Sequence, residues 1–324
     1  EKKAEFGCFR MPSKDGGEVL YFFDDDLLIH TSKTCHVTRV TNLKTKKKCV
    51  LKFMREREQY DTEIRMRQLG GANGEQQLSA SCVVQILERH VFTPQELQQR
   101  ADSCGSRTPK ATAIRDFGCH VVVMERGERD LADIIAHDLI AGVDLTKVQS
   151  IGRSLAECLH TLEQHKRTHG DTKPRNAMEF RQDDDGLAIQ TIDLDASAHH
   201  GELAGLKWSS AFAPPELAAL IYEYEYEPLP QAKRAPWTQY LQELPAEKQV
   251  RASATFDVWS FGMVMYSLAS YEGAMPFLVS ATDNIVRPEE LRQLAYVWEE
   301  HKLKEVSKLV WPVAQDLVLW CLQT

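Results

Sequence analysis

The densest group of chemistry-bearing side chains lies in the eight residues 169–176, His-Gly-Asp-Thr-Lys-Pro-Arg-Asn. Asp171 supplies a carboxylate, Lys173 an amine two positions later, and Asn176 an amide three positions after that. These groups can converge on one phosphate, because the carboxylate orients a hydroxyl, the amine neutralises phosphoryl oxygens and the amide holds a metal ion. The segment therefore indicates phosphoryl transfer.

A further carboxylate, Asp193, follows 17 positions after Asn176. The apolar runs 177–180 and 187–192 flank the turn sequence Asp-Asp-Asp-Gly, which predicts a small β-hairpin. A hairpin returns the chain to its starting point, so Asp193 is expected near Asn176. Mg²⁺ prefers oxygen ligands of this kind, and we expect these two side chains to hold it.

The elements that position these residues change type along the chain. Apolar and β-branched runs predict strands at 19–23, 35–40, 49–53, 82–87 and 120–124. One helical pattern, at 55–69, interrupts them and ends at Gly70 and Gly71. Helical spacing then dominates the remainder, notably at 148–165, 256–271 and 288–298. The sequence therefore predicts an α+β fold, with a β-rich first part that carries one helix and a larger, mainly α-helical second part.

Composition narrows the class of protein. The chain has 324 residues, of which 43% are hydrophobic and 27% charged, and 39 basic against 47 acidic residues give a net charge of −8. This is typical of a globular protein with about two domains, and it supplies no broad positive footprint for nucleic acid. No apolar stretch approaches the roughly 20 residues that span a bilayer. Eight scattered cysteines without a CxxC motif favour reduced thiols and a cytoplasmic location.

Five sequence blocks resemble, in the same order, the signature motifs of eukaryotic protein kinases. Residues 169–176 resemble the catalytic loop His-Arg-Asp-Leu-Lys-Pro-x-Asn, and Asp-Leu-Asp at 193–195 stands where the family has Asp-Phe-Gly. Cys-Val-Leu-Lys at 49–52 resembles Val-Ala-Ile-Lys, and Pro-Pro-Glu at 214–216 resembles Ala-Pro-Glu. Phe-Asp-Val-Trp-Ser-Phe-Gly at 256–262 is similar to the block found in tyrosine kinases and tyrosine-kinase-like kinases. The chain therefore resembles the tyrosine-kinase-like group.

The resemblance implies a bilobal protein kinase fold, with a β-rich N-lobe at 1–125 and a mainly α-helical C-lobe at 126–324. It also implies an activation segment at 193–216 after the catalytic loop, and an insertion at about 221–255. We interpret the insertion as a solvated loop, with a docking surface for a partner or a phosphorylation target as the alternatives. Because the sequence starts with Glu and ends in an uncapped apolar helix, we expect a fragment whose C-lobe is truncated.

The same resemblance implies the residues that bind ATP. Lys52 would hold the α- and β-phosphates and pair with a glutamate of the single helix. Glu63, 11 positions downstream, is the expected partner, with Glu58 as the second choice. The implied adenine contacts are an apolar sandwich, a gatekeeper and a hinge, at Val37, Val50, Met178, Met124, Glu125 and Gly127.

The acceptor is also implied by the resemblance. Serine/threonine kinases carry a lysine two residues after the catalytic aspartate, as at Lys173, and keep a threonine that contacts both groups. Ser209 or Ser210 would fill that position. Asp171 would then accept the proton of the hydroxyl while Lys173 stabilises the transferring phosphoryl group. The implied function is transfer of the γ-phosphate of Mg-ATP to Ser or Thr hydroxyls of protein substrates.

Departures from the family pattern keep other functions open. The phosphate-covering loop has His30, Ser32 and Cys35 where the family has glycines, which favours a pseudokinase acting as a nucleotide-sensing or scaffold module. Gly170 replaces the arginine that clamps a phosphorylated activation segment, so the chain resembles the non-RD kinases. His-Gly-Asp also occurs in aminoglycoside and choline phosphotransferases, which makes a small-molecule phosphotransferase the third and least favoured interpretation.

Overall fold

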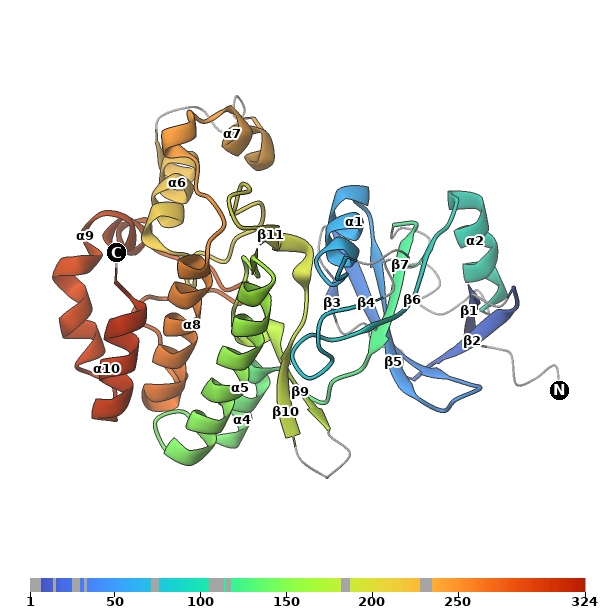
Figure 1. The fold of residues 1–324 in the computed structure, drawn as a ribbon, viewed down its shortest axis with the longest axis horizontal. Helices are drawn as coiled ribbons and strands as arrows, with labels where there is room; N and C mark the ends of the chain where they lie inside the picture. The colour runs from blue at the N-terminus through green and yellow to red at the C-terminus, as the bar shows by residue number, and fades with distance from the viewer. Residues whose placement is uncertain are drawn as a thin grey trace. The chain divides into compact units, whose positions relative to one another are not determined.

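Two compact units make up the structure, a computed structural model (Figure 1). The first unit comprises residues 1–77 and 84–126, and the second comprises 78–83 and 127–324. The residues that the structure describes are 7–13, 16–24, 30–31, 34–70, 76–104, 114, 118–181, 187–227 and 235–323. The chain thus leaves the first unit at Leu78 and returns to it at Val84.

The first unit is built on an antiparallel sheet. Its strands are β1 (Cys8–Pro12), β2 (Glu18–Phe23), β3 (His30–Thr31), β4 (Cys35–Asn42), β5 (Lys48–Met54), β6 (Ile86–Val91) and β7 (His120–Glu125). They are ordered β1-β2-β4-β5-β7-β6, and β3 pairs with β4. The predicted strand at 82–87 is wrong, since β6 begins at Ile86. Residues 82 and 83 belong to the second unit and pair there with Thr191. The Thr191 N–H donates to the Cys82 carbonyl at 2.8 Å.

Strand β5 places apolar side chains on one face of the sheet and Lys52 on the other. Cys49, Leu51 and Phe53 alternate along it and are buried in an apolar cluster. Within this cluster the Phe53 ring packs edge-on against Phe9 at a centroid distance of 5.4 Å. Successive side chains of a strand point to opposite faces, so Lys52 projects from the other side of the sheet.

Helix α1 (Arg57–Arg65) is shorter than the predicted 55–69. The guanidinium of Arg67 folds back after the helix end and donates to the carbonyl of Glu63 at 2.8 Å and to that of Val84 at 2.9 Å. Arg67 is fully buried. The helix therefore ends where this side chain turns into the interior rather than at the later glycines.

Helix α2 (Pro94–Ser103) follows strand β6. A capping box begins it: the Thr93 hydroxyl accepts the Glu96 N–H at 3.2 Å, and the Glu96 carboxylate accepts the Thr93 N–H at 2.8 Å. Thr-x-x-Glu with proline at the first helical position is a local signal for the start of a helix, so the sequence could have predicted α2.

The second unit is mainly helical. Its longer helices are α4 (Leu131–Asp138), α5 (Leu145–Gln164), α6 (Pro215–Tyr226), α7 (Trp237–Glu243), α8 (Ala254–Ala269), α9 (Pro288–Val306) and α10 (Pro312–Cys321). Two short strand pairs join β9 (Ala177–Arg181) to β10 (Leu187–Thr191) and β8 (Arg167–Thr168) to β11 (Ala198–His199). With the sheet of the first unit, this confirms the predicted mixed α+β class. None of the helices in the described part of the chain combines the length and apolar character that a bilayer crossing requires.

Helix α8 is the buried axis of the second unit (Figure 1). It packs against α5 and α10, and apolar residues cover nearly all of its surface, as expected for a helix enclosed on every side. Gly262 permits the close approach of the end of α10, because a Cβ there would lie 2.6 Å from the Cys321 Cβ and 2.9 Å from Leu322. Side chains of α8 are therefore held in fixed positions.

The predicted hairpin is present as β9 and β10. The strands pair antiparallel, with Met178 opposite Gln190 and Ala177 opposite Thr191. Its turn, residues 182–186, lies outside the described residues. The Ile192 N–H donates to the Asn176 carbonyl at 3.0 Å, so the hairpin returns the chain to the segment from which it started.

The insertion at about 221–255 is packed where the structure describes it. It contains the last part of α6 and all of α7. The Tyr224 ring contacts Trp237 at a centroid distance of 5.0 Å and Tyr240 at 5.1 Å. A solvated loop is therefore the wrong interpretation of these residues, while 228–234 lie outside the described ranges.

A surface ion-pair group at the end of α4 predicts a pH-dependent stability. Arg129 Nη1 and Lys147 Nζ lie 2.6 and 3.0 Å from the Asp138 carboxylate, and hydrogen bonds from both cations lower the pKa of Asp138. A lowered folded-state pKa stabilises the fold above the ordinary value of about 3.9, and this contribution is lost as the pH falls through the folded-state pKa. We expect Asp138→Asn to lower the free energy of unfolding by about 1 kcal/mol at pH 7, and less at pH 3. Urea unfolding at both pH values measures this, with exposed Glu157→Gln as the control; an equal loss at both would contradict it.

Candidate functional site

The catalytic-loop residues singled out from the sequence lie together in the second unit. Asn176 Nδ2 donates to the Asp171 carbonyl at 2.8 Å and to its Oδ2 at 3.1 Å. Lys173 Nζ lies 3.1 Å from the same Oδ2. A single 3₁₀ turn, Pro174–Asn176, separates the two side chains along the chain and brings Asn176 back to Asp171. The Asp171 carboxylate is thus held by one cation and one amide.

The Lys173 ammonium has three oxygen partners. It donates to Ser209 Oγ at 2.7 Å, and it lies 3.1 Å from Asp171 Oδ2 and 3.4 Å from Asp283 Oδ2. Burial lowers the pKa of Lys173, but the carboxylates of Asp171 and Asp283 outweigh burial, and the pKa is raised. Lys173 is therefore positively charged at neutral pH. Of the two serines expected to contact both Asp171 and Lys173, Ser209 accepts a hydrogen bond from Lys173.

A buried carboxylate on α8 holds the catalytic loop in place. Asp257 accepts the backbone N–H of His169 at 2.6 Å and that of Gly170 at 3.1 Å, and the Thr172 hydroxyl donates to it at 3.4 Å. Burial raises the pKa of Asp257, and the nearby His169 and these donors offset part of that effect. Asp257 therefore ties this loop to α8.

Gly170 occupies a position that excludes larger residues. Its φ is +80°, and a Cβ there would lie 2.5 Å from the Ala196 carbonyl oxygen. An arginine at this position would be strained in its backbone and would clash with the chain after β10. The positive φ of residue 170 and the nearby Ala196 carbonyl therefore favour glycine over arginine at this position.

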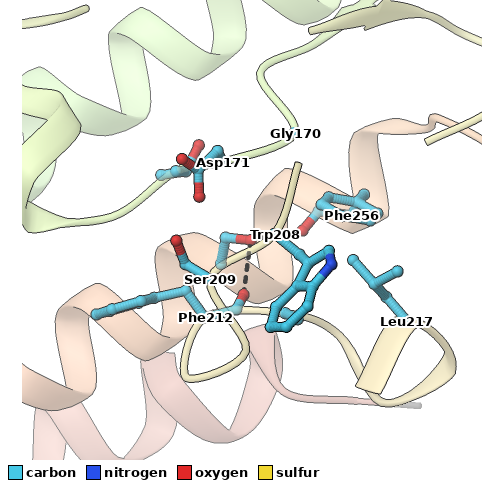
Figure 2. Close-up of a pocket in the computed structure, with 10 residues that line it drawn as sticks. Gly170, Asp171, Trp208, Ser209, Phe212, Leu217 and Phe256 are labelled. Carbon is cyan, nitrogen blue, oxygen red and sulfur yellow. Dashed lines mark hydrogen bonds between the residues drawn. The ribbon is translucent and has the colours of Figure 1, made fainter. Parts of the chain in front are cut away.

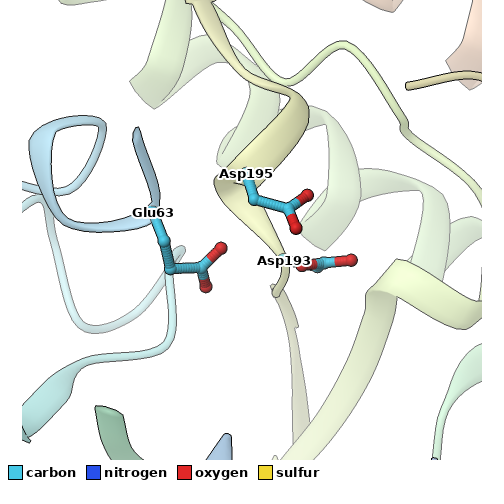
Figure 3. A group of neighbouring side chains, drawn as sticks. All are labelled: Glu63, Asp193 and Asp195. Carbon is cyan, nitrogen blue, oxygen red and sulfur yellow. The ribbon is translucent and has the colours of Figure 1, made fainter. Parts of the chain in front are cut away.

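Two further carboxylates follow β10. Asp193 adopts a left-handed conformation, with φ of 62° and ψ of 65°, and precedes the 3₁₀ turn Leu194–Ala196. Figure 3 shows Asp193 and Asp195 close together on this segment. Lys207 Nζ lies 2.6 Å from Asp195 Oδ1 and 3.8 Å from Asp193 Oδ2. A cation of the protein itself therefore neutralises the Asp195 carboxylate and lies at the edge of the Asp193 carboxylate.

The donors predicted to hold Mg²⁺ fit that ion chemically. Since Asn176 Nδ2 donates to Asp171, its amide oxygen is the atom that would ligate a metal. The Asp193 carboxylate would supply negative charge, and Mg²⁺ is commonly bound through one or two carboxylates with other hard oxygens. Lys207 competes with the metal ion for the same carboxylate.

A small pocket opens beside Asp171 (Figure 2). Its lining combines the catalytic loop with the segment before α6 and with α8: Gly170, Asp171, Thr172, Trp208, Ser209, Phe212, Ala213, Leu217, Phe256 and Ser260. The Ser260 hydroxyl donates to the Phe212 carbonyl at 2.9 Å and fixes that wall. A polar edge at Asp171 and Ser209 thus adjoins aromatic and aliphatic walls, which suits a hydroxyl group with an apolar neighbour.

The first unit contains a buried ion-pair group of its own. Lys52 Nζ lies 3.2 Å from Glu63 Oε2, and Arg67 Nη1 lies 3.0 Å from Glu63 Oε1. Glu63 projects from α1 (Figure 3), and all three side chains are at least 96% buried. Glu58, the second choice for this contact, is exposed on the same helix. The Glu63 carboxylate therefore contacts two buried cations.

The other predicted nucleotide contacts of the first unit lie on its central strands. Val37 is on β4, Val50 on β5, and Met124 and Glu125 end β7. Val50 stands directly opposite Met124 in the β5–β7 ladder. Val37 and Val50 are half-buried, whereas Met124 is buried. Their predicted role in adenine binding stays a prediction.

Gly127 and Met178 belong to the second unit. A Cβ at residue 127 would lie 2.4 Å from Met178 Sδ, so the absence of a side chain allows the chain to pass close to β9. Met178 forms an isolated antiparallel bridge with Asp130, and the Glu128 N–H donates to the Glu179 carbonyl at 2.8 Å. The segment that follows β7 is therefore fixed against the hairpin.

The positions that lack the family glycines are only partly described. His30 belongs to the short strand β3, and Cys35 begins β4. Ser32 lies outside the described residues. The consequence of these substitutions for phosphate binding stays a prediction.

Three charged residues of these groups, Arg67, Lys207 and Asp283, were not predicted from the sequence. Arg67 had a local signal, because Glu63 precedes it by four positions, a spacing that pairs side chains on a helix face. Lys207 and Asp283 had none, since their partners are at least 12 positions away and on other elements. Both were identifiable only once the chain was folded.

Removal of the Glu63 charge is expected to destabilise the first unit strongly. Glu63→Gln would remove the carboxylate that contacts both buried cations, Lys52 and Arg67, and a buried pair that loses one charged partner is destabilised by about 3–5 kcal/mol. Glu58→Gln, on the exposed side of the same helix, should change stability by less than about 0.5 kcal/mol. Thermal unfolding of both variants tests this, and equal melting temperatures would contradict it.

Removal of the Asp257 carboxylate is expected to release the catalytic loop. Asp257→Ala would leave the N–H groups of His169 and Gly170 without their acceptor, at about 1–3 kcal/mol for each buried donor. Amide hydrogen exchange should accelerate at these two residues in a chain that keeps its helical circular dichroism. Asp316→Ala, at an exposed position on α10, is the control. Unchanged protection at residues 169 and 170 would show that the contact is not what holds the loop.

Comparison with known proteins assigns no family to the chain. No protein-family model matches it. A search of curated proteins finds no significant match. A functional assignment therefore rests on the residues and on their geometry.

Proposed function

We propose that the chain is a protein kinase domain of bilobal fold that transfers the γ-phosphate of Mg-ATP to Ser or Thr hydroxyls of protein substrates. The observation that carries this proposal is the fixed carboxylate of Asp171, held by Asn176 Nδ2 at 3.1 Å and Lys173 Nζ at 3.1 Å beside the pocket. The five motifs that resemble the kinase family support it independently.

Asp171 has the properties that a phosphoryl-transfer base requires. Its carboxylate lines the pocket and is partly exposed, so a small polar group can reach its oxygens. Asp171 would orient that hydroxyl and accept its proton as the oxygen attacks the γ-phosphorus and the bond to ADP breaks. Lys173 would neutralise the charge on the transferring phosphoryl group, as its charged state permits.

Mg²⁺ would be held by the Asn176 amide oxygen and the Asp193 carboxylate. When bound, the ion supplies charge neutralisation at the phosphate oxygens of ATP. Lys52 would contact the α- and β-phosphates, and Glu63 at 3.2 Å fixes the direction of its side chain. These roles follow the family resemblance.

A nucleotide-sensing or scaffold pseudokinase is the second candidate. Lys207 is the observation that favours it, because its ammonium already neutralises Asp195 at 2.6 Å and lies 3.8 Å from Asp193. A protein cation at these carboxylates weakens the affinity for a metal ion. The four retained groups Lys52, Asp171, Asn176 and Asp193 favour the active enzyme.

Transfer of labelled γ-phosphate to a degenerate Ser/Thr peptide mixture tests the proposal. The wild-type chain should transfer phosphate in Mg²⁺, and Asp171→Asn should reduce the rate on the order of 100-fold or more, because it removes the proton acceptor at nearly constant shape. Chelation of Mg²⁺ should abolish transfer.

Lys207→Gln separates the two candidates. In an active kinase that must displace Lys207, this variant should bind Mg²⁺ more tightly and keep transferring phosphate. If the folded wild type and Lys207→Gln both bind ATP but transfer no phosphate, the active-enzyme proposal fails and the pseudokinase is supported.

A further inference from the structure

The loop between α8 and α9 is fastened to the segment that precedes α6. The Ala211 N–H donates to the Asp283 carbonyl at 3.2 Å, and the Ser210 N–H donates to Asn284 Oδ1 at 2.9 Å. In the other direction, the Ile285 N–H donates to Ser210 Oγ at 2.8 Å. An isolated antiparallel bridge between Val279 and Ile285 closes the loop at its base. The two segments are therefore joined by backbone as well as by side-chain contacts.

The contacts described above place Asp283 at the catalytic loop. Its Oδ2 lies 3.4 Å from Lys173 Nζ, and its Oδ1 lies 3.5 Å from Arg175 Nε. The side chain is 15% exposed. Both carboxylate oxygens thus face cations of the segment that carries Asp171.

The backbone of Asp283 is in the left-handed region, with φ of 62°. Aspartate tolerates this conformation better than most residues, but it still costs free energy that surrounding contacts must offset. Here the Asp283 N–H donates to the Ser280 carbonyl at 3.1 Å, and its own carbonyl accepts the Ala211 N–H. The loop is therefore held in a conformation that aims one carboxylate at Lys173.

We infer that Asp283 is a positioning residue that fixes the Lys173 ammonium against Asp171 and Ser209. A lysine side chain is flexible, and its ammonium has exactly three N–H donors to satisfy. Ser209 accepts a hydrogen bond from the Lys173 ammonium, and Asp171 and Asp283 pair with its charge, so loss of the Asp283 carboxylate would remove one of these charge partners and loosen the ammonium. The inference rests on the proposed function, in which Lys173 contacts the transferring phosphoryl group.

The same contacts bear on regulation. Gly170 leaves the catalytic loop without the arginine that would clamp a phosphorylated segment, whereas Asp283 supplies a permanent negative charge next to Lys173 and Arg175. Residues 210 and 211 are held by hydrogen bonds to the loop that carries Asp283. We therefore expect the segment to be ordered, and transfer to proceed, in the unphosphorylated chain.

Charge-removing variants at Asp283 test the inference. Asp283→Asn keeps the size and the tolerance of left-handed backbone, and Asp283→Gly accepts that backbone without strain should the first variant not fold. Either should lower kcat about tenfold with an unchanged KM for ATP, because Lys173 is misplaced rather than lost. Asp283→Glu, which keeps the charge, should recover part of kcat. Glu289→Gln, at an exposed position six residues along, should have no effect.

A second readout does not depend on activity. Acetylation of Lys173 by acetic anhydride, followed by mass spectrometry, should accelerate in Asp283→Asn and Asp283→Gly and stay unchanged in Glu289→Gln. Unchanged Lys173 acetylation in both folded Asp283 variants would overturn the inference whether or not the chain transfers phosphate. Faster acetylation in a chain whose wild type is inactive would support the anchoring of Lys173 and overturn the proposed function.

Phosphatase treatment tests the regulatory part. The wild-type chain should transfer phosphate at the same rate before and after treatment, once mass spectrometry has shown that residues 193–216 carry no phosphate. A loss of activity on treatment would show that a phosphorylated residue, rather than the Asp283 carboxylate, orders the segment.

Discussion

The geometry of the candidate site in the second unit depends on the hydrogen bonds that the buried Asp257 carboxylate accepts. It stands on α8, a helix enclosed by its neighbours, so its position is set by packing rather than by the loop it binds. The loop must bring two consecutive N–H groups, those of His169 and Gly170, to one side chain. Gly170 has a positive φ within this turn, in a space too small for a Cβ. Asp171 then follows directly and has little freedom in where its carboxylate points.

Charge sharing governs the rest of the site. Lys173 contacts two carboxylates, and Lys207 likewise lies near two. In the first unit a single anion contacts two cations instead, because Glu63 lies between the buried side chains of Lys52 and Arg67. A buried charge is costly unless it is paired, and removal of one partner is more costly than the pair is favourable. Such groups add little net stability, but they restrict each side chain to one position, which the proposed phosphoryl transfer would require.

The sequence predicted the parts of the site that depend on short spacing. The convergence of Asp171, Lys173 and Asn176 follows from one turn of chain, and the hairpin after them follows from alternating runs around a turn sequence. The contact between Lys52 and Glu63, 11 positions apart, was instead expected from the resemblance to the protein kinase family. By contrast, the strand predicted at 82–87 was wrong, because apolar residues alone do not reveal whether a segment pairs with its neighbouring strand or with a distant one.

The sequence by itself therefore determined the mixed α+β class, the grouping of Asp171, Lys173 and Asn176, and the carboxylate that follows the hairpin, because short spacing, local periodicity and turn chemistry control these features. Only the tertiary structure decided that Asp283, 110 positions after Lys173, lies against it, and that Lys207 neutralises Asp195. An isolated aspartate in a polar loop carries no periodic signal, and its partner is selected by the packing of whole helices. The physical reason is that long-range ion pairs form wherever the folded backbone brings opposite charges together, which no spacing along the chain encodes.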